Sequence, residues 1–384
     1  MEFYNSFFRS ACKKYGFSEN DKTVFCNVAK TIDQDPDFSE KFNGIRRRYL
    51  FPKPSSLQDA LKELKLLGEE KGIHEYTIHM VFLIVCSQQL LKWYRKKGYP
   101  DALFWETMLD LGYKAAECQD IKHIPGTYVA HWNDKFFLLD RFTRGRFQYE
   151  RGIFPLDYVT KSGQKIAAGS KCLHVHIPSS GVPLTDEVRM DSYRKAYDFF
   201  RDELQDGILV LHCSSWLLDP KQKEFLPEHS NVLKFLNDFQ VYRGESYDNF
   251  PDGWRIFGDA WGLPVEQLPE KTGLQRAYKK WLLAGNWGGR GWGGIWNWAA
   301  AVRSCVSSSS SCCRISRVWV SGSFAVASSA NRRASSACFT ASRARCSCSC
   351  FLRDSAAFRA LSSRCRRRDS SVNVCLLACR VRSS

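Results

Sequence analysis

The feature that most constrains the fold of this chain is a strand–helix–strand pattern over residues 172–218. Apolar and polar side chains alternate in the first strand, so His174 and His176 are expected on the face opposite to its apolar residues. A helix with Thr185 as its N-cap follows, and a mostly apolar strand over 208–218 ends the unit. A crossover helix of this length predicts that the two strands are parallel neighbours in one sheet, joined by a right-handed connection.

The residues before this unit show helical rather than strand patterns. Leucines spaced three and four residues apart predict a helix over 55–72, and two more helices are predicted over 73–98 and 101–114. The longest apolar run, residues 78–91, is too short and too often interrupted by polar side chains to cross a bilayer. We therefore expect an all-helical N-terminal domain and no membrane partner.

Short strand patterns surround the parallel unit. Residues 123–156 contain aromatic and β-branched runs separated by turn residues, which predicts successive antiparallel strands. Two further strands are predicted over 239–243 and 254–262, and a helix then begins at a capping box formed by Thr272 and Gln275. Together these patterns predict an α+β fold in which a helical domain precedes a domain built on a mixed β-sheet.

The composition changes near Trp287, and the two parts need separate interpretations. From this residue on, the chain has sixteen Arg, no Lys and two acidic residues, whereas the first 286 residues carry 40 basic and 38 acidic side chains. The net charge of +16 therefore describes the tail and not the body. Ten of the sixteen cysteines also lie in the tail, at spacings that fit no zinc site, and we expect no metal.

Residues 296–384 form a tail rich in Arg, Ser and Cys, for which three origins are open. Such a mixture without Lys is typical of GC-rich coding DNA read in a wrong frame, and a frameshift is the interpretation that we favour. A disordered appendage and an arginine-rich arm that binds nucleic acid are the alternatives. We assign the tail no function and do not expect nucleic acid as a partner.

Four segments of the body resemble a known family: LHVHIPSSGVPLTDEVRMDSYRKAYDFF, LHCSSWLLDP, SNVLKFLNDF and LQRAYKKWLLAGN. They are similar in order and spacing to bacterial acyltransferase-domain proteins, which pair a helical N-acyltransferase N-terminal domain with a GNAT-like C-terminal domain. The likeness covers roughly residues 1–295 and none of the tail. It implies an N-acyltransferase N-terminal domain over 1–128 and a GNAT-like α/β acyltransferase domain with a mixed β-sheet over 129–295.

The resemblance implies acyl-CoA or acetyl-CoA as the co-substrate, held where the two parallel strands splay apart. The loop formed by Ser179, Ser180 and Gly181 would then receive the pyrophosphate in front of a helix N-terminus, where free backbone N–H groups favour anions. Asn231, at the start of the following helix, is a further candidate contact. The loop lacks the Q/R-x-x-G-x-G/A pattern of the working enzymes, and the acidic first turn that begins at Asp186 opposes a bound pyrophosphate.

Transfer of an acyl group to an amine needs a base for the amine, donors for the thioester oxyanion and an acid for the departing thiolate. His174, His176 and Glu150 are our candidate bases, because they converge on adjacent predicted strands. The backbone N–H groups of residues 175–177 are the oxyanion donors that the resemblance implies. For each side chain taken alone, a satisfied polar residue on a sheet face is the alternative interpretation.

Other side chains offer further chemistry. Tyr242 and Ser214 are candidate acids. Cys213 follows His212, but neighbouring strand residues point to opposite faces, so we interpret this cysteine as a buried core residue. An aromatic cluster with two acidic neighbours could bind a sugar or an acyl chain, although core packing is its default interpretation. The cluster comprises Trp254, Phe257, Trp261, Asp252 and Asp259.

We interpret the chain as an acyl-CoA-dependent N-acyltransferase that acts on an amine of a small molecule or a peptide. One alternative is a non-catalytic GNAT-like module that binds a ligand or a partner after losing its pyrophosphate loop, and a weaker one is nucleic-acid binding through the basic tail. A start without a secretory signal and six scattered cysteines in the body predict a cytoplasmic protein. The acceptor, the acyl chain length and the oligomeric state are open.

Overall fold

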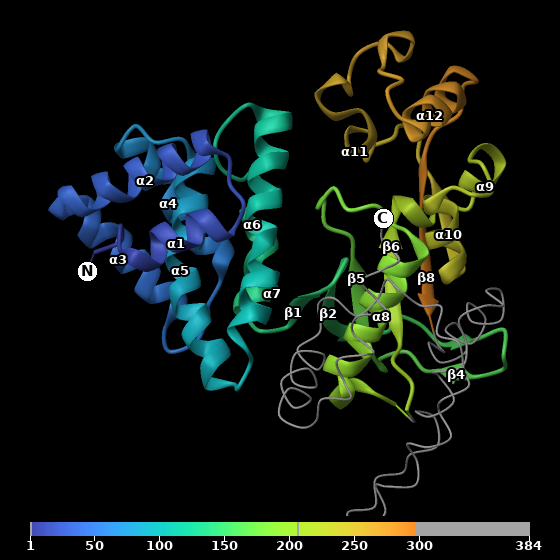
Figure 1. Cartoon of the computed structure of the whole chain (residues 1–384), viewed down its shortest axis with the longest axis horizontal. Coiled ribbons are helices and arrows are strands. Elements are labelled where there is room, and N and C mark those ends of the chain that lie inside the picture. The colour runs from blue at the N-terminus through green and yellow to red at the C-terminus, as the bar shows by residue number, and fades with distance from the viewer. Residues whose placement is uncertain (1, 206, 296–384) are drawn as a thin grey trace, which may run out of the picture. The chain divides into compact units, whose positions relative to one another are not determined.

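The computed structural model describes residues 2–205 and 207–295, which belong to one compact unit of the chain. Our interpretation of residues 296–384 as a frameshifted or disordered tail lies outside the described residues. The described part consists of a helical region followed by a mixed β-sheet with its own helices (Figure 1), which confirms the predicted α+β fold.

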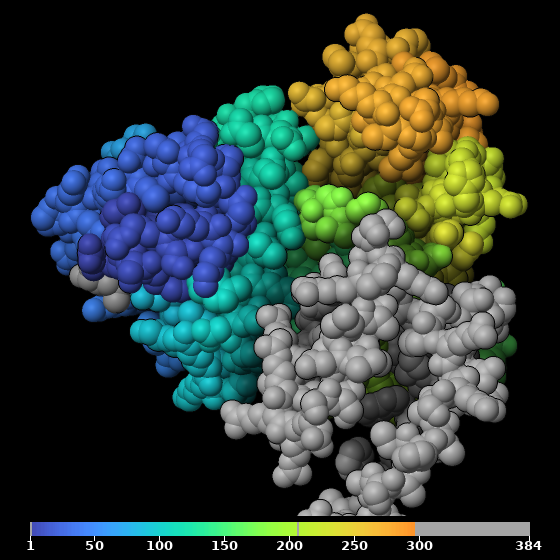
Figure 2. All heavy atoms as spheres, in the orientation of Figure 1, coloured from blue at the N-terminus to red at the C-terminus, as the bar shows by residue number. Residues whose placement is uncertain are grey.

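The N-terminal region is a helical bundle arranged around one central helix. In the space-filling view its helices form one continuous, close-packed body (Figure 2). The central helix, α5, is buried on nearly all sides and supplies more buried residues than any other helix of the bundle, including Phe82 at 0 % exposure. The helices are α1 (Ser6–Lys14), α2 (Glu19–Gln34), α3 (Pro36–Leu50), α4 (Leu57–Glu70), α5 (Glu75–Lys96) and α6 (Asp101–Lys122).

The helices predicted over 55–72 and 73–98 are confirmed as α4 and α5. The hydroxyl of Ser56 accepts a hydrogen bond from the N–H of Asp59 and so caps α4. Helix α6 is eight residues longer than the predicted 101–114. Its second half still presents small apolar residues to the core at helical spacing, since Ala115 and Cys118 are both fully buried.

The strands predicted at the start of the segment 123–156 are wrong. Residues Ala130–Asn133 form a 3-10 helix, α7 follows over Asp134–Phe137, and the sheet begins only at Arg141. Aromatic residues favour strands on average, but here Phe136 and Phe137 are almost fully buried at the end of a short helical connection. Tertiary packing overrides the local preference.

The sheet has six strands in the order β1-β2-β5-β6-β8-β7. Strands β5 and β6 pair in parallel, as the strand–helix–strand pattern predicts, and every other neighbouring pair is antiparallel. A separate two-stranded hairpin is formed by β3 (Tyr158–Val159) and β4 (Lys165–Ile166). The six strands are β1 (Arg141–Arg144), β2 (Phe147–Ile153), β5 (Lys171–His176), β6 (Leu211–Ser215), β7 (Gln240–Ser246) and β8 (Gly289–Ile295).

The helices of the sheet region are mostly where the patterns place them. Thr185 caps α8 (Asp186–Phe199), and α12 (Gly273–Leu283) begins with the predicted capping box. The strand predicted over 254–262 is wrong, because α11 (Trp254–Phe257) and a 3-10 turn occupy this segment. Phe257 packs there into a small second core with Phe250. The remaining helices are α9 (Gln222–Phe225) and α10 (Asn231–Asp238).

The two faces of the sheet have different coverings. Helix α8 packs on the face of Phe147 and Tyr149, where the Tyr149 hydroxyl lies 3.0 Å from Ser192 Oγ. The opposite face meets α6 of the helical region, because Gln148 Nε2 donates to Asp110 Oδ1 at 2.6 Å. This second face therefore lies where helical region and sheet join. None of the helices in residues 2–205 and 207–295 has the length and apolar character needed to span a membrane.

Candidate active site

The two histidines of β5 share one face of the sheet, as the alternation predicts. Leu173 and Val175 are buried in the core at 0 % and 2 % exposure, whereas His174 and His176 project from the opposite face and are half-buried. The register of β2 places Glu150 directly opposite His174 on that face. The structure thus brings the three candidate bases onto one polar surface, while their catalytic roles stay predictions.

Glu150 is the centre of a buried ionic cluster, which we call the Glu150 cluster (Arg141, Glu150, His176 and Trp132). Glu150 Oε2 accepts hydrogen bonds from Arg141 Nη2 at 2.6 Å and Nε at 3.0 Å, and it lies 2.9 Å from His176 Nε2. The Arg141 guanidinium also lies over the Trp132 ring, 3.7 Å from its centroid. Trp132 packs edge-on against the His176 ring, so this imidazole is held from two sides.

The electrostatics of this cluster fix the protonation of His176. Burial alone would raise the pKa of Glu150, but the hydrogen bond with His176 and the charge of Arg141 outweigh burial and lower that pKa to about 2. Burial lowers the pKa of His176. A neutral imidazole beside an ionised carboxylate must donate from Nε2, because the carboxylate can only accept. Nδ1 of His176 then carries a lone pair, and no described residue donates to it.

A second set of rings, the Tyr242 cluster (Tyr242, His212 and His174), continues along the same face. Nδ1 of His174 lies 2.9 Å from Nδ1 of His212, and Nε2 of His212 lies 2.8 Å from the Tyr242 hydroxyl. Burial, followed by the neighbouring histidines, lowers the pKa of His212 to about 4, and burial also lowers the pKa of His174. The cluster is therefore neutral at pH 7 and holds no ionised partner.

The free nitrogen of His174 is enclosed by the neighbouring strand. A Cβ added to Gly152 on β2 would lie 2.3 Å from His174 Nε2, so this glycine is what leaves room for the ring. The other ring nitrogen, Nδ1, is already used by His212. His176, whose side chain is 26 % exposed, is thus the better placed of the two β5 histidines to receive a proton from a ligand.

The parallel strands separate immediately beyond these side chains. The pairing of β5 with β6 comprises Leu173 with Leu211 and His174 with His212. Beyond these pairs, β5 continues to pair with β2 up to His176, whereas β6 continues to pair with β8 up to Ser215. The splay that the resemblance implies is therefore present, and His176 lies on the strand that borders it.

The loop after β5 is held by one residue of α6 and by a hydrogen bond within the loop itself. The Ser179 hydroxyl donates to the Glu117 carboxylate of α6, and the Ser180 hydroxyl accepts from the N–H of Val182 at 3.4 Å. Gly181 has a φ of +73°, a left-handed conformation that L side chains rarely adopt. The predicted pyrophosphate loop is thus ordered by one bond to α6 and one bond within the loop, and its role in binding acyl-CoA stays a prediction.

Arg146, in the turn between β1 and β2, is a residue that the sequence analysis missed. Its Nε donates to the carbonyl oxygen of Val182 and its Nη1 to that of Pro178, both at 2.8 Å. Burial lowers the pKa of Arg146 to about 10, and no carboxylate in the described residues pairs with it. A cation without a counter-ion therefore lies directly against the candidate pyrophosphate loop. An alternating strand pattern could not reveal it, because it lies in a turn.

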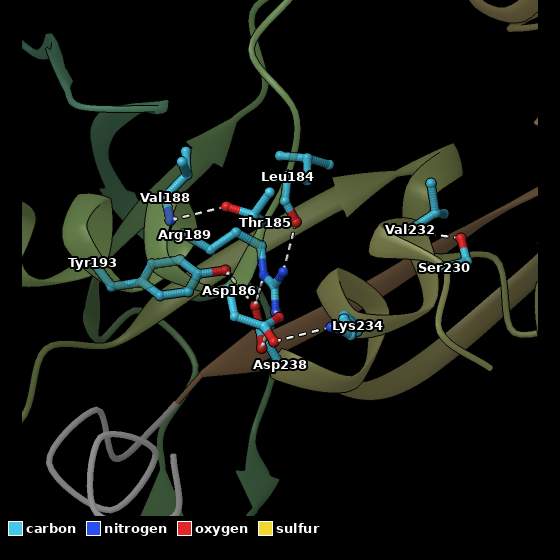
Figure 3. Close-up of polar contacts among 10 residues, drawn as sticks. All are labelled: Leu184, Thr185, Asp186, Val188, Arg189, Tyr193, Ser230, Val232, Lys234 and Asp238. Carbon is cyan, nitrogen blue, oxygen red and sulfur yellow. Dashed lines mark hydrogen bonds and ion pairs between the residues drawn. The ribbon is translucent and has the colours of Figure 1, made fainter. Parts of the chain in front are cut away.

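The N-terminus of α8 is less acidic in effect than its sequence suggests (Figure 3). Asp186 forms ion pairs with Lys234 of α10 and with Arg189, both at 3.0 Å. Arg189 also donates to Asp238 Oδ2 at 2.6 Å and to the carbonyl oxygen of Leu184 at 2.7 Å. The repulsion that we expect between Asp186 and a bound pyrophosphate is therefore reduced by Lys234 and by Arg189, which Asp186 shares with Asp238. The same contacts join α8 to α10.

Asn231 belongs to α10 and not to the loop. It occupies the first turn of α10, one turn before Lys234, and lines a cavity of about 290 Å³ together with Gly273 of α12. No hydrogen bond joins Asn231 to residues 179–181 within the described residues. Its role as an acyl-CoA contact stays a prediction.

The other candidate residues from the sequence lie in different environments. Tyr242 belongs to the polar face, whereas Ser214 is exposed and has no hydrogen bond to a described side chain. Cys213 is 1 % exposed and burial raises its pKa to about 12, in line with its interpretation as a core residue. The aromatic cluster packs as core, since Phe257 stacks on Trp261 at 5.7 Å. No group of His, Cys, Asp or Glu in the described ranges is arranged to hold a metal ion.

Comparison with known proteins gives two domain matches and a set of similar structures. A model of the N-acyltransferase N-terminal domain matches residues 6–138, and a model of the GNAT-like C-terminal domain matches residues 142–295. None of the curated proteins matches the chain.

Three crystal structures of an acyltransferase are similar in fold. The first, a complex with decanoyl-CoA and teicoplanin, has 21 % identity and a TM-score of 0.59, and the match covers 75 % of this chain and 87 % of that chain. A decanoyl-CoA complex has 22 % identity, a TM-score of 0.57 and coverages of 75 % and 86 %. A complex with CoA and 10C-teicoplanin has 20 % identity, a TM-score of 0.57 and coverages of 76 % and 88 %. At such identities the likeness concerns the fold.

Proposed function

Since the chain belongs to the acyltransferase family that joins an N-acyltransferase N-terminal domain to a GNAT-like C-terminal domain, we propose that it transfers an acyl group from acyl-CoA to an amine with His176 as the general base. The observation that carries this proposal is the Glu150 cluster. An ionised Glu150 orients a neutral His176 on the strand that borders the β5–β6 splay. A base that is neutral at pH 7 and turned by a fixed carboxylate is what amine deprotonation requires.

Different residues of this face carry out different steps of the reaction. The amine nitrogen attacks the thioester carbonyl carbon while Nδ1 of His176 takes a proton from that nitrogen. The tetrahedral oxyanion is stabilised by backbone N–H groups of residues 175–177, at the end of β5. The intermediate then expels the CoA thiolate and forms the amide. Glu150 acts as a positioning residue, because a carboxylate with a pKa of about 2 is a weak base.

The departing thiolate needs a proton, and the Tyr242 cluster is suited to supply it. Burial raises the pKa of Tyr242 to about 12, so its hydroxyl stays protonated at neutral pH. The hydroxyl reaches His174 through His212 in two hydrogen bonds of 2.8 and 2.9 Å. The Tyr242 hydroxyl gives its proton directly to the thiolate, since the free nitrogen of His174 is enclosed by β2. The phenolate accepts a hydrogen bond from Nε2 of His212 and then regains a proton from solvent. We keep Ser214 and the His176 imidazolium as alternative donors.

We assign the acyl-CoA pyrophosphate to the loop of Ser179, Ser180 and Gly181, with Asn231 as a more distant contact. Arg146 supports this assignment, because its guanidinium lies against the loop and pairs with no described carboxylate. The first-turn N–H groups of α8 add the dipole of a fourteen-residue helix. Ser179 must release Glu117 if its hydroxyl is to bind a phosphate oxygen.

We propose a small-molecule or peptide amine as the acceptor. The structures with similar folds include complexes with teicoplanin, which supports an acceptor of this size. A cytoplasmic location fits the six cysteines of the described residues, all of which are free thiols.

The competing function is a non-catalytic module that binds acyl-CoA or a partner without turnover. It is favoured by the Ser179–Glu117 bond, which occupies a hydroxyl of the loop. Nucleic-acid binding rests on the tail, which lies outside the described residues. Incubation of the full chain with decanoyl-CoA and a panel of peptide and small-molecule amines, followed by mass spectrometry of free CoA and amide, separates the first two. Acyl-CoA binding by calorimetry with no CoA release from any amine would contradict the enzyme and leave the binding module.

A further inference from the structure

The helical region contains a cavity that shares no residue with the candidate active site. Its volume is about 440 Å³, and it lies between the start of α1, the end of α3 and the middle of α5. The polar lining consists mainly of Arg46, Gln88, Gln89 and Lys92. A cavity of this size accommodates a small organic molecule.

Arg46 is a buried cation without an ionic partner. It is 7 % exposed, and its Nε and Nη2 both donate to one neutral acceptor, Asn43 Oδ1, at 3.1 and 2.8 Å. No carboxylate within residues 2–205 and 207–295 forms an ion pair with it. Nη1 makes no hydrogen bond to a described residue, and Arg46 is one of the residues that line the cavity. Burial lowers the pKa of Arg46, as expected for a charge whose hydration is not replaced.

One face of α5 supplies further hydrogen-bond donors. Val85, Gln88, Gln89 and Lys92 follow the i, i+3, i+4, i+7 spacing and therefore point to the same side. Gln88 accepts a hydrogen bond from Asn5 through Oε1, which leaves its amide N–H groups free of described partners. Lys92 is exposed and adds a second positive charge at the rim. The donors of this face and the Arg46 guanidinium thus line the same cavity.

The remaining wall of the cavity is apolar. Phe3 and Phe8 are buried beneath it at 1 % exposure, and Phe7 and Phe51 complete the ring of aromatic side chains. Glu2 is the one acidic residue among the lining residues, and it is exposed and forms no ion pair with a described cation. The cavity therefore combines an apolar wall with an excess of positive charge.

We propose that this cavity binds a small carboxylate with an apolar body, whose carboxylate group pairs with Arg46. A carboxylate matches the planar guanidinium in geometry and replaces the hydration that burial removes. The amides of Gln88 and Gln89 supply further donors, and the apolar body packs on the phenyl rings. The site is independent of acyl transfer, and its test does not depend on turnover.

Isothermal calorimetry of the full chain with sodium octanoate tests this site. Two control ligands each carry one feature of octanoate: 1-octanol has the apolar body without the charge, and inorganic phosphate has the negative charge without the apolar body. Octanoate is expected to bind more tightly than either. The variant Arg46→Gln should lose between about tenfold and a hundredfold in octanoate affinity, since a hydrogen-bonded charge is removed. The matched variant Arg47→Gln, whose side chain is exposed one position along α3, should bind as the wild type does.

Two further measurements keep the test independent of folding defects. Lys92→Gln changes an exposed side chain and should weaken octanoate binding by about two- to fivefold at low salt. This measurement tests the site even if Arg46→Gln fails to fold. Saturating decanoyl-CoA should leave octanoate binding unchanged. The proposal is overturned if octanoate does not bind, if it binds Arg46→Gln as tightly as the wild type, if Lys92→Gln has no effect, or if decanoyl-CoA displaces it.

Discussion

The Glu150 cluster and the Tyr242 cluster lie side by side on the same sheet face, yet their electrostatics differ completely. Each contains a β5 histidine, and the two histidines are only two residues apart. His176 contacts a carboxylate that Arg141 keeps ionised, whereas His174 contacts another neutral imidazole. Identical side chains on one strand can thus take different roles, because strand pairing gives them different partners.

The largest difference between the clusters is expected in turnover. His176→Ala should lower kcat by about 10² to 10⁴-fold, the range for loss of a general base. His174→Ala removes a member of the neutral cluster and should lower kcat by about tenfold or less. Mass spectrometry of CoA release with decanoyl-CoA and a reactive amine measures both. Equal losses in the two variants would contradict the division of roles.

The second difference is expected in stability, because only the Glu150 cluster contains a buried ion pair. Glu150→Gln leaves Arg141, which is 4 % exposed, without an anionic partner and should lower the free energy of unfolding by about 3 kcal/mol. His176 also loses the acceptor that fixes its tautomer, so kcat should fall by about tenfold to a hundredfold while KM changes little. Urea unfolding measures the free energy of unfolding, and initial rates measure kcat and KM. As a control, Glu187→Gln removes an acidic residue outside both clusters and should leave stability within about 0.5 kcal/mol.

Two residues, one from each cluster, should lose their contributions to stability in different pH windows. His212 has a folded-state pKa of about 4 against an ordinary 6.5, so the unfolded chain takes up its proton first and stability falls as pH drops from 6.5 towards 4. Glu150 has a folded-state pKa of about 2 against an ordinary 4.5, so its contribution is lost only as pH drops from 4.5 towards 2. Each window should be worth about 3 kcal/mol, since one pKa unit is about 1.4 kcal/mol.

Variants show which residue is responsible for each pH window. Urea unfolding at a series of pH values should show a flatter dependence between pH 6.5 and 4 for His212→Asn and between pH 4.5 and 2 for Glu150→Gln. If His212→Asn flattens the lower window instead, the assignment of charges to the two clusters is wrong.

The smallest expected effect is at the outer end of the neutral cluster. Tyr242→Phe removes one hydrogen bond, from a hydroxyl that lies 2.8 Å from His212, and should lower the free energy of unfolding by about 1 kcal/mol. If Tyr242 supplies the proton for the thiolate, kcat also falls by about tenfold, and least for acyl donors with an acidic thiol. A kcat that does not change would leave Ser214 or the His176 imidazolium as the donor.

Local patterns were sufficient to predict the parts of this face that lie within one strand or one hairpin. Alternation in residues 172–177 predicts the shared face of His174 and His176, and pairing of adjacent strands predicts that Glu150 joins them. The capping signals of α8 and α12 are similarly local, and both are confirmed. Such features depend on the backbone period and on neighbouring side chains, which a sequence displays directly.

Long-range partners could not be predicted in this way. The bond between His174 and His212 depends on the register of two parallel strands 38 residues apart, which no local signal fixes. Arg146 becomes important because it donates to the carbonyl oxygens of Val182 and Pro178, which lie 36 and 32 residues further along the chain. The wrong strands over 130–137 and 254–262 have a related cause, since aromatic side chains were buried there by short helices and turns.

The pH dependence of kcat/KM tests most directly whether His176, held by Glu150, is the base. The wild type should gain activity with rising pH through a midpoint below the ordinary histidine value of 6.5, because burial lowers the pKa of His176. Glu150→Gln should move this midpoint lower still, because it removes the contact that raises that pKa. His174→Asn should instead move the midpoint slightly higher, because His174 is one of the groups that lower the pKa of His176. An acid limb that persists with the same midpoint in His176→Ala would contradict the account.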